Sequence, residues 1–159
     1  AVMLMEAFAG FEAKYEYAMI GHDGESPHIP LVAFGAPPTT LDEKLSVVRT
    51  MYWNASFAMS GDNTLASAAL GIELASARDG DDHFTFVVSD ANVAAYGISS
   101  RVLARVLNSA ADVNVFAMFI ASPDDAERLL EEVDRTKAFV VLDTARLPKV
   151  FKDCLAAVV

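Results

Sequence analysis

Apolar residues recur every three or four positions at the start of the chain and predict an amphipathic helix of roughly four turns. These residues are Leu4, Phe8, Phe11 and Tyr15. The same spacing predicts a second helix after Thr40, because Thr40 and Glu43 stand in the positions of a capping box. The apolar positions of the second helix are Leu41, Leu45, Val48 and Tyr52.

Further helices are expected in the second half of the chain. Residues 65–78 are small and apolar, which predicts a helix packed closely on a sheet, with Gly71 at the close approach. Ser99 or Ser100 caps a helix whose apolar residues are Val102, Leu103, Val106 and Leu107. The sequence Ser-Pro-Asp-Asp at 122–125 starts another helix, and Pro148 opens the last one, with Phe151 and Cys154 facing inward.

Strands are predicted at residues 15–21, 31–34, 84–89, 113–121 and 138–142. Residues 84–89 show no polar alternation, so both faces of that strand are expected to be covered, as in a parallel sheet. The order α, β, β, α, α, β, α, β, α, β, α predicts an α/β fold with a doubly wound, mostly parallel, Rossmann-like sheet in three layers. The 159 residues suit a single domain.

Charge excludes several partners. The formal net charge is -10 and no run of Lys and Arg is interleaved with aromatics, so nucleic acid and anionic membrane surfaces are poor partners. No stretch is long and apolar enough for membrane insertion. The single cysteine, Cys154, excludes an internal disulfide and is expected to be a small core residue.

Candidate ligands lie in two loops, 60–64 and 89–92, where Thr64 and Asp90 supply oxygen atoms. Such donors suit Mg²⁺, Mn²⁺ or Ca²⁺ rather than zinc. Each residue also has a simpler interpretation, with Thr64 as a helix cap and Asp90 as a turn residue. The chain has no Gly-x-Gly-x-x-Gly sequence and no visible Ser-His-Asp arrangement.

The two loops, in SGDNT and VVSDAN, together with the order of elements, resemble a von Willebrand factor A (vWA) domain. The resemblance implies a metal-ion-dependent adhesion site (MIDAS) in which Thr64 is the ligand of the second loop and Asp90 that of the third. The first loop of the family, Asp-x-Ser-x-Ser, follows a central strand, and neither is found here. We therefore expect residues 1–159 to be a vWA-like domain truncated at its N-terminus, lacking its first strand, with Mg²⁺ binding weak or absent.

Longer segments, among them MSGDNTLASA, VVSDANVAAYGI and VNVFAMFIAS, are similar to the carboxyl-terminal domain of a group of large AAA-type ATPases associated with mitochondria. The resemblance implies an intracellular, mitochondrial parent protein whose ATP hydrolysis belongs to other domains. This chain is then a non-catalytic, metal-dependent interaction module. Its partner is another protein or another domain of the parent ATPase.

Two alternatives stay open at this stage. In one, the chain is a small α/β enzyme or receiver-like domain that uses Asp90, at the strand end, as a nucleophile or metal ligand. Lys137 precedes a strand rather than following one, which weakens the receiver interpretation. In the other, the chain is an assembly module whose metal site has decayed.

Overall fold

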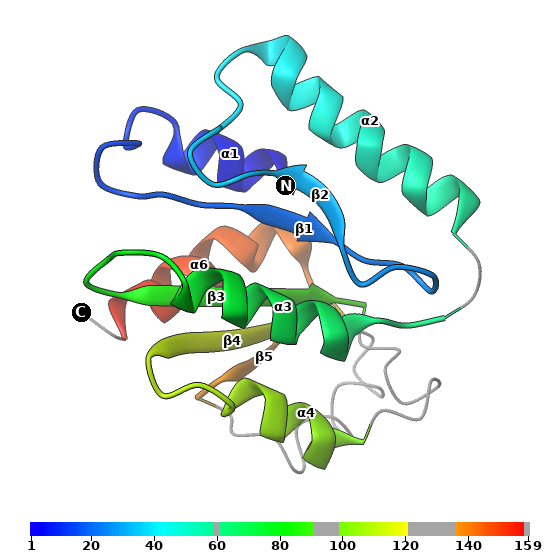
Figure 1. The fold of residues 1–159 in the computed structure, drawn as a ribbon, viewed down its shortest axis with the longest axis vertical. Coiled ribbons are helices and arrows are strands. Elements are labelled where there is room, and N and C mark those ends of the chain that lie inside the picture. The colour runs from blue at the N-terminus through cyan, green and yellow to red at the C-terminus, as the bar shows by residue number, and fades with distance from the viewer. Residues whose placement is uncertain (59–60, 91–98, 121–135, 158–159) are drawn as a thin grey trace. The chain divides into compact units, whose positions relative to one another are not determined.

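The computed structural model describes residues 1–58, 61–90, 99–120 and 136–157 (Figure 1). Contacts divide the chain into two compact units, Ala1–Asn63 and Thr64–Val159, called unit 1 and unit 2 below. None of the described helices has the length and apolar character needed to cross a lipid bilayer. The prediction of a single domain concerns how the two units pack together, and it stays a prediction.

Unit 1 begins with a helix that is shorter than the periodicity predicts. Helix α1 spans Val2–Phe8, and Gly10 then takes a φ of 83°, in the left-handed region that ends many helices. The amide of Gly10 donates to Glu12 Oε1 at 2.9 Å. The apolar repeat continues past Gly10 because Phe8 packs its ring against Tyr15 and Tyr17 from a turn and an extended segment. Helical spacing alone does not reveal that change of backbone.

Two short antiparallel strands follow in unit 1. Strand β1 spans Met19–Gly21 and β2 spans Ile29–Val32, with a register shift between Met19 and Ile20. The predicted strand at 15–21 is therefore correct only at its end. The small core of the unit joins Met5 of α1, Val32 of β2 and Val47 of the following helix.

Helix α2, Leu41–Phe57, starts at the predicted capping box, with Thr40 Oγ1 accepting from the Glu43 amide. Lys44 ties the helix to α1 through a 2.8 Å ion pair with Glu6. The apolar positions that the spacing marks do not form its buried face, since Val47 is the buried residue. The exposed apolar side chains of α2 are Leu41, Leu45, Met51, Tyr52, Trp53 and Phe57.

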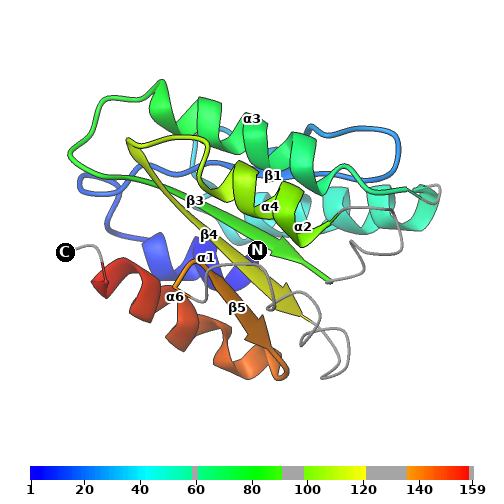
Figure 2. The same ribbon diagram turned by 90° about the horizontal axis from the view of Figure 1, so that it is seen from below.

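Unit 2 holds a parallel sheet in the order β3-β4-β5. Its elements in chain order are α3 (Thr64–Ser76), β3 (His83–Ser89), α4 (Ser100–Leu107), β4 (Val113–Ile120), β5 (Ala138–Val141), the 3-10 turn η2 (Thr144–Arg146) and α6 (Leu147–Ala156). The predicted α/β class is thus confirmed as a parallel sheet flanked by helices (Figure 2). The doubly wound, three-layer arrangement of the whole chain stays a prediction, as does the missing first strand.

Side chains on the two faces of this sheet pack against different helices. Ala68 and Ile72 of α3, with Leu103 and Leu107 of α4, join one core cluster with alternate residues of β3 and β4. On the other face Phe86 contacts Phe151 of α6, with ring centroids 4.7 Å apart. Because successive side chains of a strand point to opposite faces, the strands pack against the helices on both sides of the sheet.

Several local predictions are confirmed in unit 2. Ser99 caps α4 by accepting from the Val102 amide, and Pro148 lies in the first turn of α6. Thr85 Oγ1 donates to the Gly71 carbonyl at 3.3 Å, the close approach expected of α3. Strand β3 is less covered than predicted, because it is an edge strand of this sheet and Val88 is 42% exposed. The predicted helix start at residues 122–125 lies outside the described residues.

The capping box of α2 should make stability depend on acid pH. Hydrogen bonds from the amides of Thr40 and Thr39 lower the pKa of the Glu43 carboxyl from 4.5 to about 2. A pKa lowered by folding adds stability above the ordinary pKa, and this stability is lost as pH falls from about 4.5 towards 2. We expect Glu43→Gln to flatten that part of the profile of unfolding midpoint against pH, measured by circular dichroism.

The matched control is Ser56→Ala, which removes an exposed hydroxyl bonded to the Tyr52 carbonyl near the other end of α2. This variant should keep the wild-type dependence on pH. An unchanged slope in Glu43→Gln would show that the carboxylate does not cap the helix in solution.

Candidate metal and interaction site

Thr64 is the first residue of α3 and is wholly buried. The helix is held against β3 by the contact of Gly71 with Thr85, where an added Cβ on Gly71 would meet Thr85 Cγ2 at 3.3 Å. This packing fixes the start of α3 relative to the sheet. A position at the start of the helix agrees with both interpretations of Thr64, as a helix cap and as a ligand.

Asp90 directly follows β3 and is exposed. The parallel register that pairs His83 with Val113 and Ser89 with Phe119 fixes where β3 ends. Asp90 therefore stands at the carboxyl edge of the sheet, where open α/β sheets bind their ligands. The neighbouring Ala91 and Asn92 lie outside the described residues.

The start of α3, which is Thr64, and the end of β3, which Asp90 follows, lie towards the same end of unit 2 (Figures 1 and 2). After α3, a short connection at residues 77–82 leads into β3, which runs back along the helix, so the start of the helix lies at the side where the strand ends. The two oxygen donors thus come from separate elements to one edge of the unit. This juxtaposition requires the parallel sheet and the packing of α3 on it.

The described residues do not by themselves form a metal site. They contain no group of three or more His, Cys, Asp or Glu side chains that could hold an ion. Mg²⁺ needs a near-octahedral shell of oxygens and gives up its waters reluctantly. One buried hydroxyl and one exposed carboxylate do not meet that need.

A second loop contact lies at the end of unit 1, in the segment just before Thr64. Asn63 Nδ2 donates to the Asp23 carbonyl at 2.7 Å, and Asp23 Oδ1 accepts from the amides of Glu25 and Ser26. An added Cβ on Gly61 would lie 2.7 Å from Gly24 Cα. Asn63 lies in the candidate loop 60–64, and the glycines in both loops, Gly61 and Gly24, were the sequence signal for this close approach.

A comparison with known proteins finds a relative that is similar to nearly the whole chain. The chain is 35% identical over 151 residues, 94% of its length, to von Willebrand factor A domain-containing protein 8 of Mus musculus. The similarity supports a vWA-like domain. The matched part is 8% of the length of that protein, so the chain corresponds to a small portion of it. No family model matches the chain. No solved structure matches it either.

The geometry of unit 2 gives no support to a receiver-like site in this vWA-like chain. Lys137 precedes β5, and its Nζ donates to Asn108 Oδ1 at 2.8 Å, just after α4. The Lys137 carbonyl accepts from the Ala117 amide, beside the middle of β4, whereas Asp90 lies at the carboxyl edge of the sheet. The Nζ of this lysine is bonded at the end of α4, which leads into the start of β4, so it is directed away from the edge where Asp90 lies.

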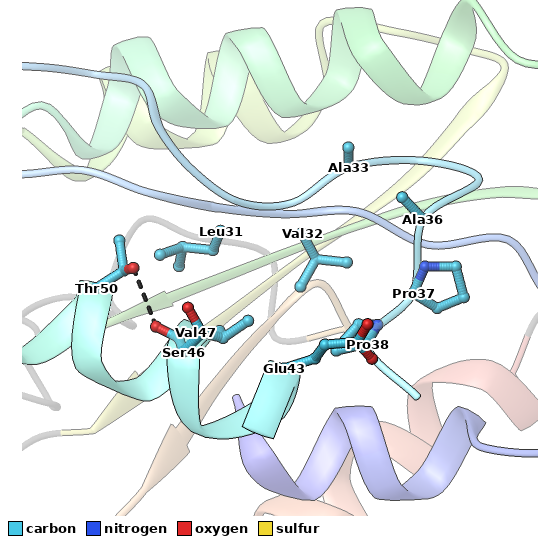
Figure 3. Close-up of a pocket in the computed structure, with 10 residues that line it drawn as sticks. All are labelled: Leu31, Val32, Ala33, Ala36, Pro37, Pro38, Glu43, Ser46, Val47 and Thr50. Carbon is cyan, nitrogen blue, oxygen red and sulfur yellow. Dashed lines mark hydrogen bonds between the residues drawn. The ribbon is translucent and has the colours of Figure 1, made fainter. Parts of the chain in front are cut away.

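An open groove of about 420 Å³ lies between β2 and α2 in unit 1 (Figure 3). Most of its lining is apolar or proline, and the side chains of Glu43 and Thr50 are hydrogen-bonded within α2 and its cap. The Glu43 carboxylate accepts from the Thr39 amide at 2.8 Å, and Thr50 Oγ1 donates to the Ser46 carbonyl at 3.0 Å. The groove therefore offers no converging polar groups of the kind that catalysis requires.

Substitution of Gly61 should test the loop contact. In Gly61→Ala the new methyl group would overlap the backbone of Gly24, and overpacking of this kind costs about 1–3 kcal/mol. Chemical denaturation followed by circular dichroism measures the loss. The control is Gly80→Ala, where the nearest atom, His83 Nε2, is 3.5 Å from the added Cβ. Equal stability of the two variants would contradict the contact.

Proposed function

We propose that the chain is a vWA-type domain that binds a protein partner and that its complete form does so through a divalent cation. The similarity to von Willebrand factor A domain-containing protein 8 over 94% of the chain carries this proposal. The location of Thr64 and Asp90 towards the same end of unit 2 supports it, because the vWA resemblance assigns them to two loops of one site. The cation is Mg²⁺, with Mn²⁺ or Ca²⁺ as substitutes that accept the same oxygen donors.

The remaining ligands belong, in this proposal, to residues that precede Ala1 in a longer protein. The described strands fall into two separate sheets, β1-β2 and β3-β4-β5. A two-stranded sheet is marginal by itself, and a further strand would add both hydrogen bonds and an Asp-x-Ser-x-Ser loop. In this proposal that strand completes the vWA-like domain, of which residues 1–159 are the larger part.

The parent protein is, by the same resemblance, an AAA-type ATPase of mitochondria. The proposal gives this domain no catalytic residue, so ATP hydrolysis belongs elsewhere in the parent. The domain would bind either a separate protein or another domain of the ATPase, with a carboxylate of the partner filling the open position on the metal. The acidic charge of the chain, -10, makes direct contact with another acidic surface costly unless a cation lies between them.

Calorimetric titration with Mg²⁺ tests the metal site. We expect residues 1–159 to bind Mg²⁺ only weakly, because two donors do not replace the ion's hydration shell. The chain extended upstream through its Asp-x-Ser-x-Ser loop should bind at least tenfold more tightly, a difference of about 1.4 kcal/mol. Asp90→Asn in the extended chain should remove most of that gain.

The matched control in the extended chain is Asp153→Asn, an exposed carboxylate on α6. It should leave Mg²⁺ binding unchanged. Tight binding by residues 1–159 alone, or equal binding by the Asp90→Asn variant, would overturn the proposed site.

Partner binding is tested with the parent protein lacking this domain. We expect the immobilised, extended domain to bind it in Mg²⁺ and to release it in EDTA, as measured by interferometry. Thr64→Val should weaken binding in Mg²⁺, because it removes a hydroxyl ligand while keeping the shape of the side chain. Binding that is equal in Mg²⁺ and EDTA would contradict a metal-dependent interface and leave only a metal-independent assembly role.

A further inference from the structure

One side of α2 carries apolar residues that unit 1 does not bury. Leu41 is 73% exposed, Tyr52 is 69% exposed and Leu45 is 38% exposed. Val47 and Thr50 lie on the other side, which faces Leu31 and Val32 of β2 (Figure 3). A helix that is apolar on both sides is expected to have a partner on each.

The exposed side has the spacing of a helix-pairing seam. Leu41, Leu45, Val48 and Tyr52 are separated by four, three and four residues, which is the heptad pattern of a and d positions. Ala55 continues the pattern for one more position. The seam therefore extends along most of the 17 residues of α2.

Charged residues flank this seam, and their signs are complementary between two antiparallel copies of the helix. Asp42 and Arg49 are exposed, and each directly follows a d position of the seam. When two copies of α2 pair antiparallel, Leu41 of one faces Tyr52 of the other, and Leu45 faces Val48. The same register sets Asp42 of each copy beside Arg49 of the other, which gives two symmetry-related opposite-charge pairs.

We propose that the exposed side of α2 binds a second copy of this chain through an antiparallel α2–α2 contact with two-fold symmetry. Such a contact is isologous, so one surface serves both copies. A parallel pair is disfavoured, because heptad geometry would set Lys44 of one copy against Arg49 of the other, two positive charges. Charge thus selects one of the two orientations that the apolar seam permits.

The resulting dimer is weak. The seam contributes four large apolar side chains from each copy, which places it among small interfaces. Each copy also carries a net charge of -10, and the repulsion between two such copies opposes association. We therefore expect a monomer–dimer equilibrium that responds to protein concentration. The contact lies within unit 1 and is independent of the proposed metal site in unit 2.

Sedimentation equilibrium of the 159-residue chain over a series of concentrations tests the dimer. Tyr52→Ala should weaken dimerisation about tenfold or more, because it removes a large aromatic side chain from the seam. Phe57→Ala is the matched control, since Phe57 is 72% exposed on the same helix but lies outside the heptad positions. A chain that stays monomeric at every concentration, its seam covered from within or reserved for another protein, would overturn the proposal.

Charge reversal tests the antiparallel register. Asp42→Lys and Arg49→Glu each set like charges together in a homodimer, so each variant should dimerise about tenfold less well than the wild type. An equimolar mixture should recover association, because Lys at 42 then faces Glu at 49 while Arg49 faces Asp42. Circular dichroism must show wild-type helicity for each variant.

Failure of the mixture to recover association, with both variants folded, would overturn the antiparallel register. Equal weakening by Phe57→Ala and Tyr52→Ala would place the contact elsewhere and overturn the seam. All measurements are made in EDTA and repeated in Mg²⁺. A dimer in both conditions is the expected result, and a dimer in Mg²⁺ only would assign the contact to the metal face instead.

Discussion

The parallel pairing of β4 with strands on both of its sides is the constraint on which unit 2 depends. Strand β4 pairs with β3 from Val113 to Phe119 on one edge and with β5 from Ala117 to Ile120 on the other, so its carboxyl half has strand neighbours on both edges. Its side chains are buried on both faces, with Val115 and Phe119 on one and Met118 on the other. Helices must therefore cover both faces of the sheet, because neither face of this apolar strand can be exposed to water without cost.

The direction of these strands also decides where chemistry can occur. Parallel strands end at one edge of the sheet. Because β3 runs back along the preceding helix α3, the start of α3 lies at this same end of the unit. Thr64 and Asp90 are far apart in sequence, and the topology of the unit brings them to the same end. Lys137 lies just before β5, and its Nζ bonds to Asn108, between α4 and β4. This placement of Lys137 gives no support to the receiver-like interpretation of Asp90.

Features carried by local sequence were predictable, and features that depend on distant contacts were not. The capping box at Thr40 and the cap at Ser99 were found because each is complete within four residues. The first helix was predicted too long because periodicity records apolar spacing and does not show that Gly10 adopts a positive φ. For α2 the spacing identified an apolar side, but sequence does not say whether the chain itself covers that side.

The candidate site shows the same division. The position of Asp90 after a buried strand was readable, because a strand and the turn after it are continuous in sequence. The bond from Asn63 to Asp23 joins residues 40 positions apart, and nothing local predicts it. The proposed role of Thr64 and Asp90 as metal ligands depends on a third loop, Asp-x-Ser-x-Ser, which residues 1–159 do not contain.

The one cysteine of the chain has a consequence of its own. Cys154 is 1% exposed on the inner side of α6, and burial, with a further contribution from the charge of Asp153, raises the pKa of its thiol to about 11. Such a thiol reacts slowly with alkylating reagents, because the reagent cannot reach the sulfur and little of the thiol is in the reactive thiolate form. Its labelling rate therefore records how often α6 leaves the sheet. The chain carries a built-in reporter of the opening of unit 2, with no second thiol to confuse the signal.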